Sequence, residues 1–327
     1  MYFDVDGLIN RFLRGRRPLF DARIAAGRVC DGHGDLLADD IFCTRDGPRV
    51  LDCIEFDDQL RWTDTLADVA FLAMDLERLG RSDLARRFLD HYAVAAGDDW
   101  AASLEHQYVA HRAAVRAKVA CLRHGQGDDT AAARAGALIA MAWAHLRTGR
   151  VRLVLVGGPP GTGKSTIARG IAAETSWTVI RSDVVRKELA GMAAHADAHA
   201  ALDHDLYSLP FTTRTYEALL DRAGEALESG LSVLLDASWS DPGWRRRAGD
   251  LAANTSSELI ALQCDAPAAV ALERVDARAH ARDDASDADT AIAAVMRERF
   301  APWPDARVID TATTRDKSIA AALHVVR

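Results

Sequence analysis

The stretch "GGPPGTGKST" at residues 157–166 decides the fold of the second half of this chain. It carries the spacing G-x-x-x-x-G-K-[ST], follows the apolar run "VRLVLV" and opens a helical pattern, which is the strand–loop–helix context that the spacing requires. Glycines let consecutive backbone N–H groups point inward and bind an anion, and the start of the helix adds a favourable dipole. We therefore expect a phosphate-binding loop. Its fixed positions are Gly158, Gly163, Lys164 and Ser165.

The residues of this loop predict ATP and Mg²⁺ as cofactors. Lys164 is expected to reach the β- and γ-phosphates, and the hydroxyl of Ser165 is expected to bind Mg²⁺. The alternative is a glycine turn that precedes a helix and binds nothing. The residues predicted to bind the nucleotide are Gly158, Pro159, Pro160, Gly161, Thr162, Gly163, Lys164, Ser165 and Thr166.

Strand and helix patterns alternate through the rest of the second half. Alternation of this kind predicts an α/β fold, in which a parallel sheet is covered by helices on both faces. The helix patterns begin with residues 164–175. The expected strands contain "VRLVLV" at 151–156, "WTVIR" at 177–181, "SVLLD" at 232–236, "ELIALQCD" at 258–265 and "RVID" at 307–310.

The first half has a different pattern, which predicts a mainly α-helical domain with a small β element. Two strand-like pieces, "DDIFCT" and "RVLDCIEF", are expected around residues 39–56, and amphipathic helices are expected from 64 to 147. The segment "TGR" at 148–150 is the expected boundary. We therefore predict two domains, at residues 1–149 and 150–327.

Charged residues at the ends of the expected strands are candidates for chemistry. Open α/β sheets place their active sites at the carboxyl ends of the strands. Asp183 lies there and is a candidate base for the hydroxyl of a substrate, with Arg186 one turn further on to hold the substrate. The alternative for Asp183 is a helix N-cap. Asp236 ends another strand and is a candidate ligand of Mg²⁺ or its water, although many strands end in Asp.

Two arginines in "ERVDARAHARDDASDADT" are further candidates. Arg274 and Arg278 have a four-residue spacing, which places them on one face of a helix. The acidic stretch that follows is typical of a lid that closes over a substrate. Arginines on such a lid would neutralise charge on the transferred phosphoryl group. The alternative is a solvated, charged helix face.

The second half resembles the P-loop small-molecule kinases, a group that includes gluconate kinase, chloramphenicol phosphotransferase, polynucleotide kinase and zeta toxin. The resemblance covers about residues 151–315 and rests on the phosphate loop, "SDVVRKEL", "LLDAS" and the arginine segment. It implies that Asp183 is the catalytic base and that Arg274 and Arg278 contact phosphates.

A second motif, "DGHGDLLADDI" at residues 31–41, is followed by "VLDCIEF". This order resembles the aminoglycoside phosphotransferase and choline-kinase-like family. The resemblance implies that Asp35, after His33, orients or deprotonates the acceptor, and that Asp52 binds Mg²⁺. Asp40 stands where the family has an Asn ligand.

Residues 1–28 contain no glycine-rich hairpin and no lysine. We therefore expect the first domain to lack the ATP-binding lobe of that family and its site to be vestigial. The order of the two halves resembles a fused bacterial family, of which this chain is expected to be a shortened form.

Composition narrows the function further. The 327 residues carry a formal net charge of −8, which argues against a nucleic-acid partner, and no apolar stretch reaches membrane-spanning length. Five scattered cysteines are typical of a reduced, cytoplasmic protein. We predict an ATP- and Mg²⁺-dependent kinase that acts on a hydroxyl of a small molecule. The alternative is an ATP-binding or ATP-hydrolysing switch whose first domain binds a partner.

Overall fold

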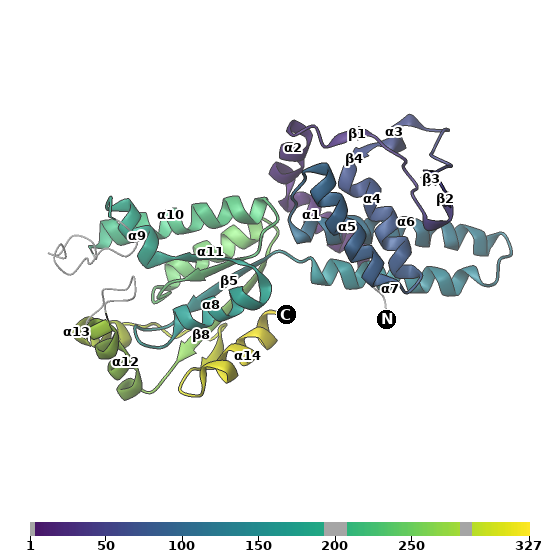
Figure 1. Cartoon of the computed structure of the whole chain (residues 1–327). Helices are drawn as coiled ribbons and strands as arrows, with labels where there is room; N and C mark the ends of the chain where they lie inside the picture. Colours follow the sequence, from purple (N-terminus) through teal and green to yellow (C-terminus); the bar gives the residue numbers. More distant parts are fainter. Residues whose placement is uncertain (1–3, 193–207, 282–289) are drawn as a thin grey trace. The chain divides into compact units, whose positions relative to one another are not determined.

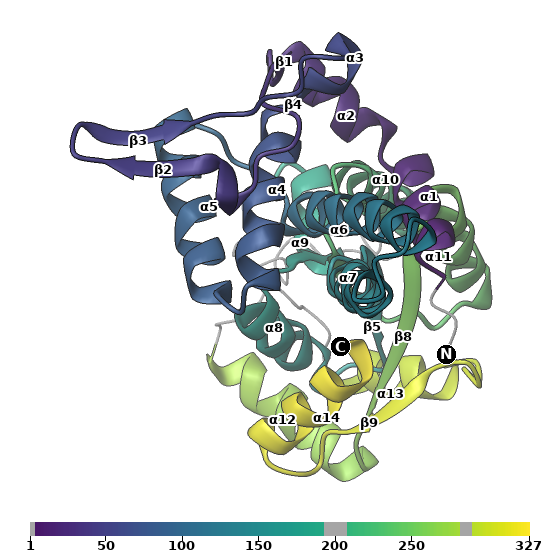
Figure 2. The same cartoon turned by 90° about the vertical axis from the view of Figure 1, so that its right-hand side faces the viewer.

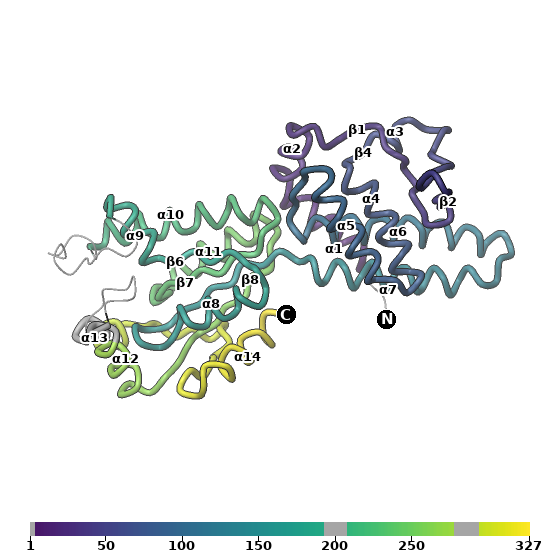
Figure 3. Tube along the Cα trace, in the orientation of Figure 1, coloured from purple at the N-terminus to yellow at the C-terminus, as the bar shows by residue number. Residues whose placement is uncertain are grey.

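The computed structural model describes residues 4–192, 208–281 and 290–327, and the side chains of these ranges except 278–281 and 290–293. The chain divides into two compact units, Met1–Arg150 and Val151–Arg327. Figure 3 shows the chain passing once from the first unit to the second. No described helix is long and apolar enough to cross a membrane.

A five-stranded sheet forms the centre of the second unit. Its strand order is β6-β7-β5-β8-β9, and every neighbouring pair is parallel. All residues of the central strand β5 are buried, which explains its continuous apolar run. The predicted α/β class is thus confirmed. The strands are β5 (Arg152–Gly157), β6 (Thr178–Arg181), β7 (Val233–Asp236), β8 (Glu258–Asp265) and β9 (Arg307–Asp310).

Helices cover both faces of this sheet (Figure 1). On one face, α8 and α14 pack over a core in which Val154 and Val156 meet Ile167, Ile171 and Ala322. Figure 1 shows α10 and α11 on the other face. The helices are α8 (Lys164–Thr175), α9 (Ser182–Leu189), α10 (Leu209–Glu228), α11 (Pro242–Asn254), α12 (Ala268–Ala281), α13 (Thr290–Glu298) and α14 (Arg315–Val326).

The first unit is mainly helical, and its two longest helices, α6 and α7, lie side by side (Figure 2). Its helices are α1 (Val5–Gly15), α2 (Arg17–Ala25), the 3-10 turn η1 (Ala38–Asp40), α3 (Asp58–Arg61), α4 (Thr65–Arg78), α5 (Ser82–Ala96), α6 (Ala102–Gly125) and α7 (Ala131–Thr148). Its strands form two antiparallel pairs, β1 (Val29–Asp31) with β4 (Trp62–Asp64) and β2 (Ile41–Thr44) with β3 (Gly47–Val50).

The expected strand over residues 49–56 is too long. Strand β3 ends at Val50, and the chain is irregular from Leu51 onward. Asp52 has φ 67°, in the left-handed region that breaks a strand. The alternating apolar pattern of "VLDCIEF" therefore does not describe a strand beyond its first residue.

A buried ion network holds the first unit together. The Arg23 guanidinium donates to Asp64 Oδ1 and to Asp98 Oδ2, both at 2.8 Å, and the Tyr108 hydroxyl donates to Asp64 Oδ2 at 3.1 Å. Burial opposes the charge of Arg23, but its bonds to both carboxylates outweigh that cost and raise its pKa. The network joins α2 to the start of α4 and to the segment before α6.

Two histidines and a glutamate form a second buried contact between α4, α6 and α7. The Nδ1 atoms of His106 and His145 lie 2.9 Å apart, and Nε2 of His145 lies 2.8 Å from Glu77 Oε2. Burial, and to a smaller extent the neighbouring His145, lower the pKa of His106 to about 4. A contact between the two Nδ1 atoms requires one of them to be unprotonated.

This contact predicts a pH-dependent stability. The pKa of His106 is about 4 when folded and about 6.5 when unfolded, so the unfolded state binds more protons between these values. We expect this residue alone to cost the first unit about 2 kcal/mol between pH 7 and pH 5. Thermal unfolding of wild type and His106→Gln at both pH values measures it. The variant should lose less stability on acidification, whereas His91→Gln, at an exposed site on α5, should behave as wild type. Equal losses in all three proteins would contradict the assignment.

Candidate active site

The loop between β5 and α8 is built around glycines that touch other backbone segments. Gly158, Gly161 and Gly163 all have positive φ, at 136°, 81° and 82°. A Cβ atom on Gly161 would lie 2.2 Å from the carbonyl oxygen of Ala271, and one on Gly158 would lie 2.5 Å from that of Cys264. Only glycine fits at these two positions, because both the backbone angle and the space exclude a side chain.

Hydrogen bonds inside the loop fix its shape. The Thr162 hydroxyl donates to the Pro159 carbonyl at 2.8 Å, and the Lys164 ammonium donates to the same carbonyl at 3.0 Å. The N–H of Gly158 donates to the carbonyl of Ser238 at 3.1 Å. The ammonium of Lys164 is therefore held over the loop, where it would meet the phosphates of a bound nucleotide.

The two predicted metal ligands lie together. One nitrogen of Arg181 donates to Asp236 Oδ2 at 3.2 Å, and another donates to Ser165 Oγ at 3.3 Å. Burial raises the pKa of Asp236, while the charges of Lys164 and Arg181 and a hydrogen bond from Ser165 act against that rise. A carboxylate and a hydroxyl that share one cationic partner are oxygen donors of the kind that Mg²⁺ takes, so the residues fit the ion.

Asp183 and Arg186 form an ion pair on α9, with Nη1 of the arginine 3.2 Å from Oδ1 of the aspartate. The N-cap of α9 is Arg181, and Asp183 lies inside the first turn without capping it. The N-cap alternative for Asp183 is therefore wrong. Asp183 is partly exposed, and its negative charge contributes to the raised pKa of Asp236.

Arg274 lies on α12, next to the phosphate loop. Its Nη2 donates to the carbonyl of Thr311 at 2.8 Å, and the Thr311 hydroxyl lies 2.8 Å from the carbonyl of Thr162. Arg274 is thus connected to the phosphate loop through a single residue, Thr311. The side chain of Arg278 lies outside the described residues, so its predicted role stays a prediction.

Several residues of the site escaped the sequence analysis. Arg181 is one, because its role depends on a contact between two strands. The others follow β7. Trp239, in the turn before α11, is fully buried, and Trp244, in the first turn of α11, stacks its ring on Tyr216 with centroids 4.9 Å apart. The two tryptophans of "SWSDPGW" were the only indication in the sequence that this segment packs against the rest of the unit.

A groove of about 620 Å³ lies between α10 and α11. Among the described residues, those that line it include Thr213, Asp241, Trp244 and Arg247. Asp183 is not one of them. The expectation that Asp183 faces an open pocket therefore stays a prediction.

The motif "DGHGDLLADDI" of the first unit, at residues 31–41, forms a loop that packs against α4 and α6. Asp35 is partly buried, and Arg116 Nη1 lies 3.2 Å from its Oδ2. Burial raises the pKa of Asp35, Arg116 opposes the rise and Asp40 adds to it. Asp68 on α4 accepts from the N–H groups of His33 and Gly34, both at 2.8 Å. The loop is therefore held by its own helices.

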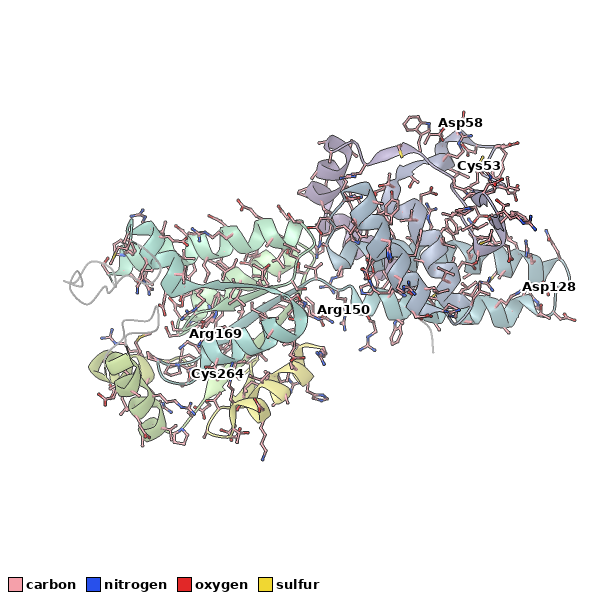
Figure 4. All side chains as sticks on the ribbon, in the orientation of Figure 1. Cys53, Asp58, Asp128, Arg150, Arg169 and Cys264 are labelled. Atoms are coloured by element: carbon pink, nitrogen blue, oxygen red, sulfur yellow. The ribbon has the colours of Figure 1, made fainter. Side chains whose placement is uncertain are left out.

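The other two acidic residues of the predicted first-unit site, Asp40 and Asp52, have different environments. Oδ2 of Asp40 accepts from the N–H of Leu37 at 3.1 Å and so stabilises the turn η1. Asp52 is exposed. Cys53 and Asp58 mark the segment that follows it in Figure 4. The charge of Asp40 thus acts on Asp35, whereas no contact in the described part of the chain joins Asp52 to Asp35.

Comparison with known proteins finds a family match within the second unit and relatives along nearly the whole chain. Residues 153–303 match the family model AAA_33, described as an AAA domain. Uncharacterized proteins of Mycobacterium tuberculosis (Rv2004c) and Mycobacterium bovis (Mb2027c) are each 46% identical over 323 residues, which is 99% of this chain. The chain spans 64% of the length of these relatives.

Solved structures resemble 54% of the chain. A sugar kinase from Janibacter sp. HTCC2649 has 18% identity and a TM-score of 0.40 over 94% of its own length. A gluconokinase from Sinorhizobium meliloti 1021 has 16% identity and a TM-score of 0.40 over 91% of its own length. The Mycobacterium tuberculosis APS kinase CysC in complex with AMPPNP and APS has 18% identity and a TM-score of 0.41 over 98% of its own length. The second unit therefore contains both the phosphate-loop motif and the match to the AAA domain, on a five-stranded parallel sheet.

The glycine contacts predict a sharp loss of stability in one variant. In Gly161→Ala the new Cβ would meet the Ala271 carbonyl at 2.2 Å, at a φ of 81°. We expect the second unit to lose about 2–4 kcal/mol of unfolding free energy. In Gly249→Ala, inside α11, the nearest atom would be 3.9 Å away, so stability should be unchanged or slightly higher. Chemical denaturation measures the stability of both variants. An unchanged stability of Gly161→Ala would show that the close contact with the Ala271 carbonyl does not constrain the loop.

Proposed function

We propose that the chain is an ATP- and Mg²⁺-dependent kinase that transfers the γ-phosphoryl group to a hydroxyl of a small molecule. The observation that carries the proposal is that Arg181 links Ser165 and Asp236 at the carboxyl ends of β6 and β7, beside the phosphate loop with Lys164. Asp183 lies in the first turn of α9, directly after β6. The phosphate loop supplies the cradle, and a partly exposed carboxylate stands beside it. The match to the AAA domain over residues 153–303 supports nucleotide binding.

Each residue has a separate task in this proposal. Backbone N–H groups of the loop and the ammonium of Lys164 hold the phosphates of ATP. Ser165 and Asp236 would hold Mg²⁺, which would screen the negative charge of these phosphates. Asp183 accepts the proton of the acceptor hydroxyl. The acceptor oxygen forms a bond to the γ-phosphorus, the bond from that phosphorus to the bridging oxygen breaks, and ADP leaves with the electron pair.

Arginines complete the proposed site. Arg186 orients Asp183 and the substrate through the ion pair of α9. Arg274 lies beside the loop and, with Arg278 further along α12, would neutralise charge on the transferred group. These roles on α12 follow the resemblance to P-loop small-molecule kinases.

For the first unit we propose a phosphotransferase-like domain, residues 1–149, without catalysis of its own. Asp35 is paired with Arg116, Asp40 stabilises a turn, and Asp52 is exposed. These contacts support a structural or docking role for the loop. A small molecule, rather than a nucleic acid, is the proposed partner of the whole chain, since its formal net charge is −8.

The division of labour predicts opposite results for two variants. Lys164→Ala removes the ammonium that meets the phosphates, so binding of Mg·ATP and its turnover should fall by at least about 100-fold. Asp35→Ala should leave ATP turnover within about twofold of wild type. Calorimetric titration with Mg·ATP and an ADP-release assay measure the two effects. Lys118→Ala, at an exposed site on α6, is the matched lysine control. Retained turnover in Lys164→Ala, or its loss in Asp35→Ala, would move the active site to the first unit.

A second substitution separates binding from chemistry. Asp183→Asn keeps the shape of the side chain but cannot take the proton of a hydroxyl. Mg·ATP should bind to this variant as to wild type, while phosphoryl transfer should fall by about 100-fold to 10,000-fold. Titration and transfer are measured on the same preparation. Transfer at the wild-type rate would reduce Asp183 to a structural partner of Arg186.

A further inference from the structure

The turn that follows β7 contains a strained residue beside the site. Trp239 has φ 51°, although it is not glycine, and its side chain is fully buried. A left-handed backbone costs a residue of this size about 1–3 kcal/mol, and such strain persists only where the surroundings enforce it. Its neighbours Ser238 and Ser240 are only partly buried. The strain therefore turns one ring into the core and leaves two hydroxyls at the surface of the site.

Bonds from several directions enforce this conformation. The indole N–H of Trp239 donates to the carbonyl of Leu235 at 3.2 Å, and its backbone N–H donates to the Tyr216 hydroxyl at 3.2 Å. The Trp239 and Tyr216 rings meet edge to face at 5.4 Å. The Arg245 guanidinium donates to the Trp239 carbonyl at 2.6 Å. The turn is thus held rigidly on both sides.

The same bonds orient a chain of hydroxyls. The Tyr216 and Ser238 oxygens lie 3.0 Å apart, and the Ser238 and Ser240 oxygens lie 3.4 Å apart. The Tyr216 oxygen accepts from the Trp239 N–H, and either hydroxyl can donate in its contact with Ser238. When Tyr216 donates, the proton of Ser238 is left for a further partner. Burial raises the pKa of Tyr216, so the phenol keeps that proton.

Ser238 lies between the two halves of the proposed reaction. Its carbonyl accepts from the N–H of Gly158, at the start of the phosphate loop. Its partner Tyr216 lies close enough to Asp183 and Arg186 to experience both of their charges. Ser238 is therefore joined by its carbonyl to the phosphate loop and by its hydroxyl to Tyr216.

We propose that Ser238 and Ser240 form a subsite that binds the hydroxyl of a neutral alcohol acceptor, with Tyr216 as a positioning residue behind it. This inference rests on the proposed function and names the acceptor class. A serine hydroxyl both donates and accepts, which matches an alcohol, whereas a carboxylate or phosphate would need donors only. Ser238 would hold the acceptor oxygen toward the γ-phosphate, and Asp183 would take its proton.

Water can occupy the same subsite, so hydrolysis of Mg·ATP in the absence of an acceptor tests the inference. Ser238→Ala should lower kcat for hydrolysis by about 10-fold to 100-fold, with the Kd for Mg·ATP unchanged. Ser238→Thr restores the hydroxyl and should restore most of kcat. Tyr216→Phe should lower kcat by a smaller factor, again without a change in Kd. Ser229→Ala, at an exposed site after α10, is the matched control.

The outcomes separate this inference from the proposed function. An unchanged kcat in Ser238→Ala, or a loss that Ser238→Thr does not restore, would overturn the subsite while leaving the kinase proposal intact. A loss in Kd that equals the loss in turnover would assign Ser238 to nucleotide binding and would overturn the subsite as well. If wild type shows no turnover that depends on Lys164, the proposed function fails, and the inference fails with it.

Discussion

The contact between Gly161 and the carbonyl of Ala271 is the constraint on which the candidate site depends. Together with the approach of Gly158 to the carbonyl of Cys264, it fixes the phosphate loop against β8 and α12. Neither contact tolerates a Cβ atom. Because the loop is held in this way, Lys164 and Ser165 begin α8 at a fixed place, and the ends of β6 and β7 bring Arg181 and Asp236 to meet Ser165. Cys264 is labelled inside the second unit in Figure 4.

The second unit combines the phosphate loop, here called the cradle, with a packed group of Tyr216, Trp239 and Arg245, here called the wall. The cradle is local, since its geometry is set by glycines within six consecutive residues. The wall is not, because it needs Tyr216 from α10, Trp239 from the turn after β7 and Arg245 from α11. Strain at Trp239 is sustained by this packing and leaves polar atoms at the surface. We regard the cradle as the nucleotide side and the wall as the acceptor side of one site.

The sequence predicted the features that depend on local pattern. The spacing of Gly158, Gly163 and Lys164 and the buried run before them indicated both the loop and the parallel sheet. Features that depend on distant contacts were missed: Arg181 acquires its role only when β6 pairs with β7, and the left-handed Trp239 has no mark in the sequence. The strand pairs of the first unit were partly misjudged because three- and four-residue strands are too short to show a period of two. Helix α14 was not predicted.

The central claim is that the second unit transfers the γ-phosphoryl group of ATP to an alcohol. The most direct measurement incubates the full chain with Mg²⁺ and ATP labelled at the γ-position, over sugars, aminoglycosides and nucleosides, and follows label in each acceptor and in inorganic phosphate. We predict that label enters one class of acceptor faster than it appears as phosphate. Label released only as inorganic phosphate with every acceptor would contradict the claim and would identify the chain as an ATP-hydrolysing switch.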